Sequence, residues 1–416
     1  MIEKVNITSY KSKVNPSPSI SLAYLFGNFL KIGSTAFGGF MALVSVIENI
    51  IVDKRQLLTH EDMLDGISLA SVLPGPVAAN VVAYVGYRLR GGIGALITAT
   101  AVLLPSFVLV VALTIAYLQA GEIPAVNKVF AGFIPAVVAI IISAATRMSK
   151  KAIKGWREVS IAAVAAILLK TIGGFYTTLI VILGAGLVGW LIFRGKVAKS
   201  LAQNPVEVEV EPLNLKKIAI PLAILATILA LSLLPIPLGE DSLAKLFVTF
   251  SGMSLMLFGG GYVFIPMIQE VVVNNYGWVT QTEFANAIAM GQITPGPILI
   301  SAAFIGYVVK GIAGAFVSTV AIFFPPGLLM VTMSHLLERI KGSVTIQAAL
   351  KGIRPAVIGM IFTAAIVVAQ TAQIGSIAAV LVSLGIFAAS LVAIWKLRLE
   401  VVLVIPLAGL IGLFLY

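Results

Sequence analysis

Four apolar stretches of this sequence are interrupted by glycine and proline, and the interruptions recur in pairs. The interrupting residues are Phe37, Gly38 and Gly39; Pro74, Gly75 and Pro76; Phe258, Gly259 and Gly260; and Pro295, Gly296 and Pro297. Proline removes a backbone donor and glycine adds backbone freedom, so each stretch is expected to break into half-helices. The free amides at a half-helix N-terminus carry partial positive charge, so the pattern predicts an anion-binding site. A kink or a close-packing glycine is the simpler interpretation of any single break, but not of four related ones.

Charged and polar side chains near these breaks are further candidates for holding the anion. Arg354, Lys351 and Lys31 lie within apolar stretches, and an ionisable residue inside a membrane segment is a functional candidate by default. An arginine can grip a tetrahedral oxyanion through two parallel hydrogen bonds, which a lysine cannot do. Asn80 and Thr294 flank the Pro-Gly-Pro triplets as hydrogen-bond donors. Alternatively, the long cations snorkel to a nearby interface, and the polar residues serve helix packing.

Two carboxylates are candidates for proton coupling. Glu48 follows the first glycine break, and Glu270 follows the second. Burial can raise the pKa of a carboxyl by several units, which would let it load and release a proton near neutrality. An ordinary interfacial carboxylate is the alternative for both residues. His60 and His335, the two histidines of the chain, are also able to titrate.

The composition excludes most other site chemistry. The chain has no cysteine and two histidines, which excludes disulfides, thiolate zinc sites, iron–sulfur clusters and a histidine-rich metal site. It contains no Walker-type phosphate loop and no catalytic constellation, so no cofactor, no metal and no enzymatic activity are predicted. The net charge of +11 fits cationic cytoplasmic loops rather than nucleic-acid binding.

The elements that must position these residues are membrane helices. The chain has 416 residues, of which 59% are hydrophobic and 11% charged, and its mean hydropathy is +1.07. Soluble chains average about 25% charged residues. Charge-free stretches such as 93–118 and 312–334 are long enough to span a hydrocarbon core of roughly 30 Å. We therefore predict an all-α polytopic membrane protein with about 10–13 membrane segments, and the continuous apolar runs exclude a β-barrel.

The chain contains one unit twice. Phe37 recurs as Phe258 and Pro74 as Pro295, each 221 residues later, and Pro135 recurs as Pro355, 220 residues later. These matches divide the chain into a cytoplasmic N-terminal tail (1–19), repeat one (20–147), connecting membrane segments with a cytoplasmic linker (148–240), repeat two (241–370) and C-terminal membrane segments (371–416).

Loop charge predicts how the two repeats lie in the membrane. The cationic loops 147–157 and 194–217 are expected in the cytoplasm, and the acidic loop 239–241 is expected outside. On this count the N-terminus is cytoplasmic, repeat one begins inside and repeat two begins outside. Two inverted-topology repeats with broken or re-entrant helices are the construction of many secondary transporters, whose binding site lies near the membrane midplane at the repeat interface.

The doubled pattern resembles that of one protein family. Phe37-Gly38-Gly39 followed by Leu73-Pro74-Gly75-Pro76, with its recurrence in the second half, is similar to the long two-domain form of the chromate ion transporter family. The resemblance covers essentially the whole chain. It implies a multi-pass plasma-membrane carrier that exports chromate, a tetrahedral dianion close in shape to sulfate, driven by the proton-motive force. A sulfate or other small-anion transporter, a passive anion channel of the same fold and a homodimer stay open.

The predicted topology is testable by cysteine labelling, since the chain has no native cysteine. We expect Arg90→Cys to be accessible from the cytoplasmic side and Lys310→Cys from the opposite side, because an odd number of crossings separates the repeats. The measurement is labelling of each variant in intact cells with a reagent that cannot cross the membrane. Labelling of both positions from one side would contradict the inverted arrangement.

Overall fold

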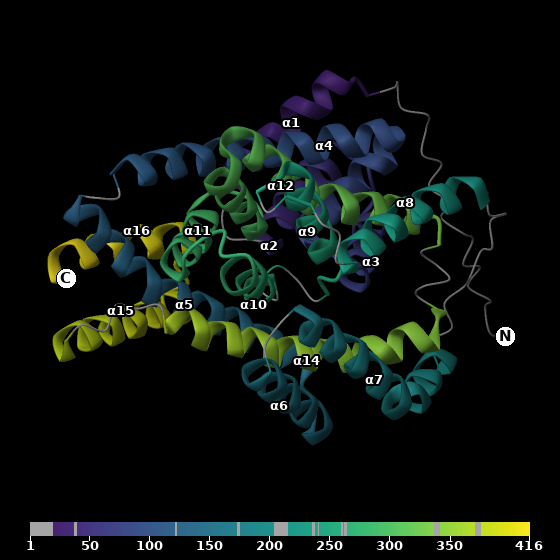
Figure 1. Cartoon of the computed structure of the whole chain (residues 1–416). Helices are drawn as coiled ribbons and strands as arrows, with labels where there is room; N and C mark the ends of the chain where they lie inside the picture. The colour runs from purple at the N-terminus through teal and green to yellow at the C-terminus, as the bar shows by residue number, and fades with distance from the viewer. Residues whose placement is uncertain are drawn as a thin grey trace, which may run out of the picture.

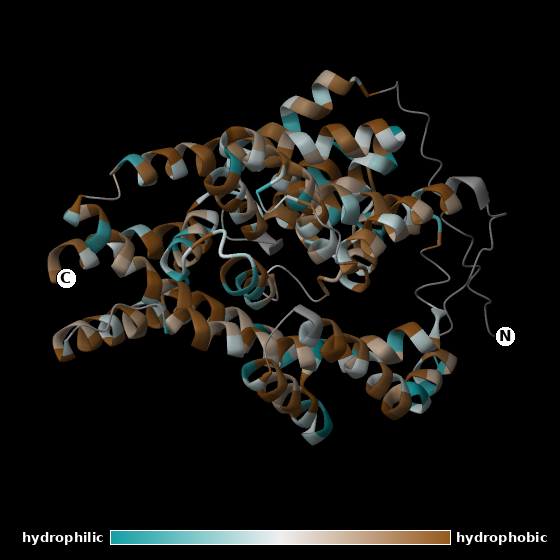
Figure 2. Cartoon of the chain, viewed as in Figure 1, coloured by the Kyte–Doolittle hydropathy of each residue, from teal (hydrophilic) through white to brown (hydrophobic). Residues whose placement is uncertain are grey.

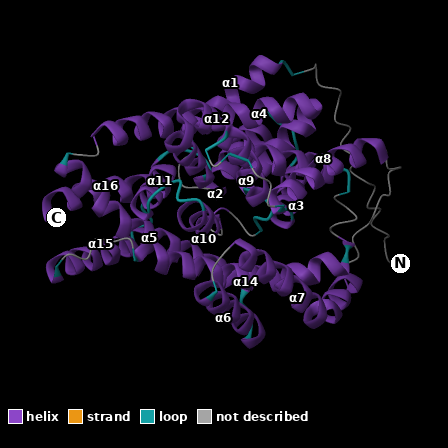
Figure 3. Cartoon of the chain, in the orientation of Figure 1, coloured by secondary structure: helices purple, strands orange, loops and turns teal. Residues whose placement is uncertain are grey.

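The computed structural model of the chain is helical throughout its described part. It describes residues 20–36, 40–120, 123–172, 175–203, 215–234, 238–239, 241–258, 261, 264–336, 342–370 and 376–416. The regular elements in these ranges are helices, and the ranges contain no strand (Figure 3). Six described helices are long and apolar enough to cross a membrane. The prediction of an all-α polytopic membrane protein is confirmed.

The two halves of the chain present helices in the same order. The first half comprises α1 (Leu22–Thr35), α2 (Phe40–Ile47) with the π-helix η1 (Glu48–Lys54), α3 (His60–Val72), α4 (Val77–Ala120), α5 (Pro124–Ala152), α6 (Trp156–Thr171) and α7 (Phe175–Gln203). The second comprises α9 (Leu243–Leu255), α10 (Phe264–Gln269) with the π-helix η3 (Glu270–Asn275), α11 (Gln281–Ile293), the 3₁₀ turn η4 (Ile298–Ile300), α12 (Ser301–Ser334), α14 (Val344–Ala369), α15 (Ile377–Trp395) and α16 (Val401–Leu415). Helix α8 (Leu215–Leu233) lies between the halves.

The outer helices consist largely of hydrophobic residues (Figure 2), and many of these are exposed. On α15, Ile377 is 82% exposed and Leu381 is 63% exposed, and α6 and α7 expose Ile167 and Leu183 to a similar extent. A continuous apolar surface of this kind suits contact with lipid rather than water. Figure 1 shows α14 and α15 along one edge of the molecule, with α1, α4 and α12 along the other.

The first Pro-Gly-Pro turn (Pro74–Pro76) is the tip of a helical hairpin. Beyond it, the first segment of α4 runs back along α3, so that the backbone of Gly66 on α3 packs against the ring of Tyr84 on α4. At the open end, Arg88 donates a hydrogen bond of 2.5 Å to the carboxylate of Asp62. Helix α3, with 13 residues, is about 20 Å long, which is less than a hydrocarbon core of roughly 30 Å. The segment therefore turns back instead of continuing across.

Each glycine break lies between two helical arms, which are α1 and α2–η1 in the first half and α9 and α10–η3 in the second. The ends of these arms that are far from the break lie side by side. The guanidinium of Arg55, after η1, stacks on the ring of Tyr24 at the start of α1, 5.6 Å from its centroid. In the second half the ammonium of Lys245 on α9 stacks on Tyr276 after η3, at 4.3 Å. The two pairs occupy equivalent positions, 221 residues apart, with aromatic and cation exchanged. Residues 37–39 and 259–260, between the arms, lie outside the described residues.

Helices α4 and α12 each contain a second reversal of the chain. The backbone leaves helical geometry at Arg90 and Gly91 in α4, where Gly91 has φ +63°. Lys310 and Gly311 do the same in α12. Beyond the α4 reversal, the Thr98 hydroxyl donates to the Val82 carbonyl at 3.2 Å. Sixteen residues of straight helix would separate these groups by about 24 Å, so each of these helices consists of two antiparallel segments.

The remaining helices are exchanged between the halves. Helices α6 and α7 of the first half pack on α14 of the second, and α15 and α16 pack on α5 of the first. The backbones meet at paired glycines: a Cβ on Gly189 would lie 2.6 Å from the Cα of Gly352, and one on Gly132 would lie 3.0 Å from the Cα of Gly412. Small residues of this kind allow the close helix packing that holds membrane bundles together.

The geometry of the first tip predicts the effect of a single methyl group. Gly75 has φ +108°, and a Cβ there would overlap the ring of Pro326. We expect Gly75→Ala to destabilise the protein by about 2–5 kcal/mol, combining left-handed strain with overpacking. The matched control is Gly91→Ala, which has φ +63° and ψ −155° but open space around the new Cβ and should cost about 1–3 kcal/mol from backbone strain alone. Equal midpoints of thermal unfolding for the two purified variants would contradict this account.

Candidate functional site

The hairpin tips of the two halves meet through a pair of reciprocal backbone hydrogen bonds. The amide of Gly75, in the first Pro-Gly-Pro turn, donates to the carbonyl of Leu257 at 2.6 Å. The amide of Gly296, in the second turn (Pro295–Pro297), donates to the carbonyl of Ala36 at 3.2 Å. Ala36 and Leu257 are the residues at which the arms before the two glycine breaks end. Each Pro-Gly-Pro turn is therefore bonded to the glycine break of the other half.

The second segments of α4 and α12 pack against these tips, again across the halves. Gly75 lies against Pro326 of α12, and Gly296 lies against Ser106 of α4, whose hydroxyl donates to the carbonyl of Pro295. Ser106 and Pro326 occupy equivalent positions, 220 residues apart. A turn from one half is thus enclosed by a long helix of the other, and the two Pro-Gly-Pro turns form one buried centre with Ala36 and Leu257.

Several polar side chains at this centre lack a hydrogen-bond partner in the described part of the chain. Asn80, fully buried, donates to the carbonyl of Pro74 at 3.1 Å, but its Oδ1 accepts no bond. Ser301 lies four residues after Pro297, as Asn80 lies four residues after Pro76, and its buried hydroxyl is unpaired. Nε2 of Gln292 is also unpaired. An unmet buried polar group costs about 1–3 kcal/mol, so a bound ligand or water that pairs with these groups would be stabilised.

A pocket of about 390 Å³ opens beside the tips. Its lining includes Ser34 of α1, Pro105 and Leu109 of α4, and Pro295 of the second Pro-Gly-Pro turn. The Ser34 hydroxyl donates to the carbonyl of Leu30 at 2.8 Å. The pocket is therefore mainly apolar and leads from the outer face of α1 and α4 towards the tips.

The structure brings together part of the residue set that the sequence singles out. Pro74, Gly75, Pro76, Asn80, Thr294, Pro295 and Pro297 are buried at or next to the tips, and Phe258 and Gly296 are half-buried. Thr294 donates to the carbonyl of Gly291 at 3.3 Å. Phe37, Gly38, Gly39, Gly259 and Gly260 lie outside the described residues.

The three candidate cations have exposed side chains. Lys351 and Arg354 lie on α14, and Lys31 lies on α1. Lys31 occupies the position equivalent to Gly252, which packs directly on Ser232 of α8 in the second half. No described helix packs on Lys31 in the way that α8 packs on Gly252, so its side chain is exposed. A role of these cations in anion binding stays a prediction.

The two candidate proton-coupling carboxylates have different partners. Glu48 bonds Nδ1 of His60 at 2.8 Å, and Asp53 lies 3.4 Å from Nε2 of the same ring. Glu270 accepts a bond of 2.7 Å from Asn274. The Glu48 cluster lies at the open end of the first-half hairpins, where His60 begins α3. This cluster connects η1, which follows the first glycine break, to α3, which leads to the first Pro-Gly-Pro turn.

Two contacts at the hairpin ends were not foreseen from the sequence. One is the Asp62–Arg88 ion pair. The sequence does contain a sign of it, because the two residues lie 13 positions before and 13 positions after Gly75, at the turn of the hairpin. The other is the contact between the Tyr87 hydroxyl and Nε2 of His335, at 2.8 Å, which joins α4 to α12. Nothing in the local sequence pairs these two residues.

Comparison with known proteins identifies the family. The profile of the chromate transporter family matches residues 23–190 and 244–413, so it recognises both halves. The chain belongs to the chromate transporter family. Among its relatives is the chromate transport protein of Cupriavidus metallidurans, 30% identical over 98% of this chain and 97% of its own length. The probable chromate transport protein of Synechococcus elongatus is 31% identical over 97% and 98%.

A half-length relative also matches this transporter. The uncharacterized transporter YwrA of Bacillus subtilis is 31% identical over 41% of this chain and 93% of its own length. No solved structure matches the chain. The membrane transporter class and the relation to chromate transport thus rest on sequence, and the meeting of the tips rests on the structure.

The unpaired hydroxyl at the second tip gives a test of the site. We expect Ser301→Ala to weaken chromate binding by about 10- to 100-fold, as for a lost hydrogen bond to an anion, without lowering thermal stability, since it also removes an unmet buried group. The control is Ser318→Ala, because Ser318 is an equally buried, unpaired hydroxyl on α12 that lies near Gly306. Equilibrium dialysis of both purified variants with labelled chromate measures the difference. Equal affinities would remove Ser301 from the site.

Proposed function

We propose that this protein is a secondary active transporter that exports chromate, held as a tetrahedral oxyanion where the two Pro-Gly-Pro turns meet the helix ends at Ala36 and Leu257. The observation that carries the proposal is the pair of reciprocal bonds from Gly75 to Leu257 and from Gly296 to Ala36. They bring two helix starts, after Pro76 and after Pro297, into one buried centre, where free amides suit an anion. Nε2 of Gln292 and the hydroxyl of Ser301 supply unpaired donors to the same centre, whereas the unpaired atom of Asn80 is the acceptor Oδ1.

We propose further that the halves are inverted in the membrane, with the N-terminus in the cytoplasm. The course of α4 supports this. Its second segment leaves the open end of the first-half hairpin at Gly91, passes the second tip at Ser106 and reaches Tyr117, whose hydroxyl accepts a bond of 3.1 Å from Asn286 on α11. Helix α12 runs the opposite course, from Gly311 past Pro326 to the contact of His335 with Tyr87. The two sets of hairpins therefore extend from the tips in opposite directions.

The proposed direction of transport follows from charge. Moving one elementary charge through the membrane potential is worth about 2.3 kcal/mol per 100 mV. A dianion leaving a negatively charged cytoplasm therefore gains about 4.6 kcal/mol per 100 mV. Proton entry through the carboxylates Glu48 and Glu270 would add the pH gradient to this driving force.

Uptake of labelled chromate by everted membrane vesicles tests the proposal. We expect saturable uptake that rises when the vesicle interior is made acidic and positive, because everted vesicles accumulate what cells export. The control vesicles carry the Gly75→Ala variant, whose tip cannot pack against Pro326, and should take up at least tenfold less chromate per inserted protein.

Two outcomes would redirect the assignment. Uptake that increases linearly with chromate and ignores the pH gradient is the behaviour of an anion channel. Strong inhibition by excess sulfate, together with faster sulfate uptake, would identify a sulfate transporter with the same tips. Sulfate is the relevant competitor because it is also a tetrahedral dianion.

A further inference from the structure

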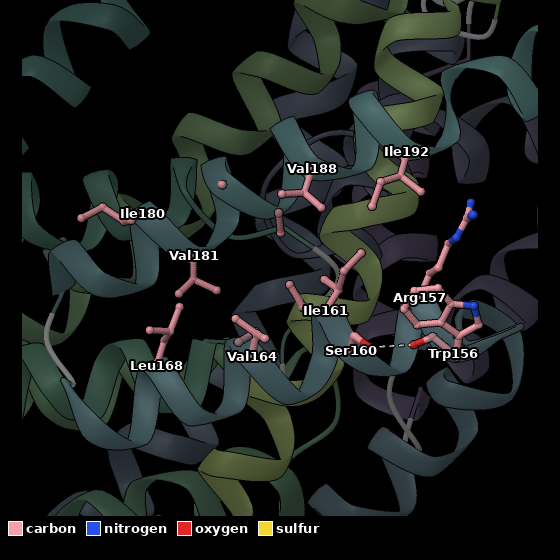
Figure 4. Close-up of a pocket in the computed structure, with 14 residues that line it drawn as sticks. Trp156, Arg157, Ser160, Ile161, Val164, Leu168, Ile180, Val181, Val188 and Ile192 are labelled. Carbon is pink, nitrogen blue, oxygen red and sulfur yellow. Dashed lines mark hydrogen bonds between the residues drawn. The ribbon is translucent and has the colours of Figure 1, made fainter.

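A long apolar cleft lies on the outside of the protein between α6 and α7. Its volume is about 750 Å³ (Figure 4). Ile161, Val164 and Leu168 line it from α6, Val188 and Ile192 line it from α7, and the buried Ala356 of α14 also borders it. The cleft is remote from the hairpin tips in sequence, and the transport proposal makes no use of it.

The length of the cleft matches one leaflet of a bilayer. Its α6 wall runs from Trp156 to Leu168, a rise of about 18 Å over twelve residues, and half of a hydrocarbon core measures about 15 Å. The cleft is kept open by small residues, among them Ala165 and Gly184. A Cβ added to Gly184 would meet no atom within 4 Å, so the space beside this glycine is free.

One end of the cleft carries positive charge. Arg157 is the one charged residue of the described lining, and its guanidinium lies 5.8 Å from the centroid of the Trp156 ring. Figure 4 shows both side chains at the same end as Ile192, with Leu168 and Ile180 at the other. Lys150 and Lys154 are exposed in the residues that lead into α6. In the described part of the chain none of these cations is within ion-pair distance of a carboxylate.

We propose that the α6–α7 cleft binds an anionic phospholipid, with an acyl chain along its apolar walls and the phosphate at Arg157. A tryptophan beside a cation at one end of an apolar path is the arrangement found at membrane–water interfaces. Anionic headgroups are attracted to such basic segments. A second copy of this chain is a poorer occupant, because a two-fold axis along the membrane normal would place Arg157 and its lysines opposite the same cations.

The structure supplies matched variants for a test by native mass spectrometry. The probes are phosphatidylglycerol and phosphatidylcholine with identical acyl chains, titrated into the purified full-length protein. We expect one tightly retained phosphatidylglycerol per chain. Arg157→Gln should weaken its retention about fivefold, the effect of one cation near an anionic surface, and should abolish the preference over phosphatidylcholine. Gly184→Phe should fill the cleft and remove retention of both lipids.

The controls lie on α7, outside the cleft lining. Arg194 stacks on Trp190 at 5.1 Å, as Arg157 does on Trp156, and Gly195 has the same open surroundings as Gly184. Arg194→Gln and Gly195→Phe should therefore retain lipid as the parent protein does. Equal retention by the parent and Arg157→Gln would overturn the headgroup assignment. A dimer that disappears in Gly184→Phe would also overturn the proposal, because the cleft would then be an interface between copies.

Discussion

Backbone groups that leave helical geometry inside hydrocarbon must find partners within the protein, and the architecture of this transporter depends on how its two Pro-Gly-Pro turns meet that requirement. The amide of Gly75 bonds the carbonyl of Leu257, and the amide of Gly296 bonds that of Ala36. Some groups of each turn are paired within their own half, as when Asn80 donates to the carbonyl of Pro74, but these two glycine amides find their partners in the other half. The contact between the halves therefore stabilises both turns.

The same exchange extends to the outer helices. Helices α6 and α7 pack on α14, and α15 and α16 pack on α5, with backbone contact at Gly189–Gly352 and Gly132–Gly412. Lipid provides no hydrophobic force between helices, so close packing of small residues supplies the attraction. These contacts tie the two halves together at the outer helices as well as at the Pro-Gly-Pro turns.

The backbone frame is nearly the same in both halves, whereas the side chains on it differ. Asn80 lies at the centre four residues after Pro76, and Ser301 lies four residues after Pro297. Lys31 occupies the position equivalent to Gly252, which contacts Ser232 of α8. The Asp62–Arg88 pair at the open end of the first hairpin has no ionic equivalent, since Val308 takes the place of Arg88. The two halves therefore share a backbone frame but present different side chains at equivalent positions.

Membrane helices, their breaks and the doubling of the chain were predictable from the sequence, because hydropathy and the backbone properties of glycine and proline act locally. The same reasoning pointed to the Pro-Gly-Pro turns and to Asn80 and Thr294, which the structure buries together. It did not reveal that the Pro-Gly-Pro segments turn back, nor that Tyr24 stacks on Arg55 and Tyr276 on Lys245. Only the tertiary structure decided which break bonds which, because the partners Gly75 and Leu257 are 182 residues apart and a hydrogen bond over that separation leaves no periodic trace in the chain.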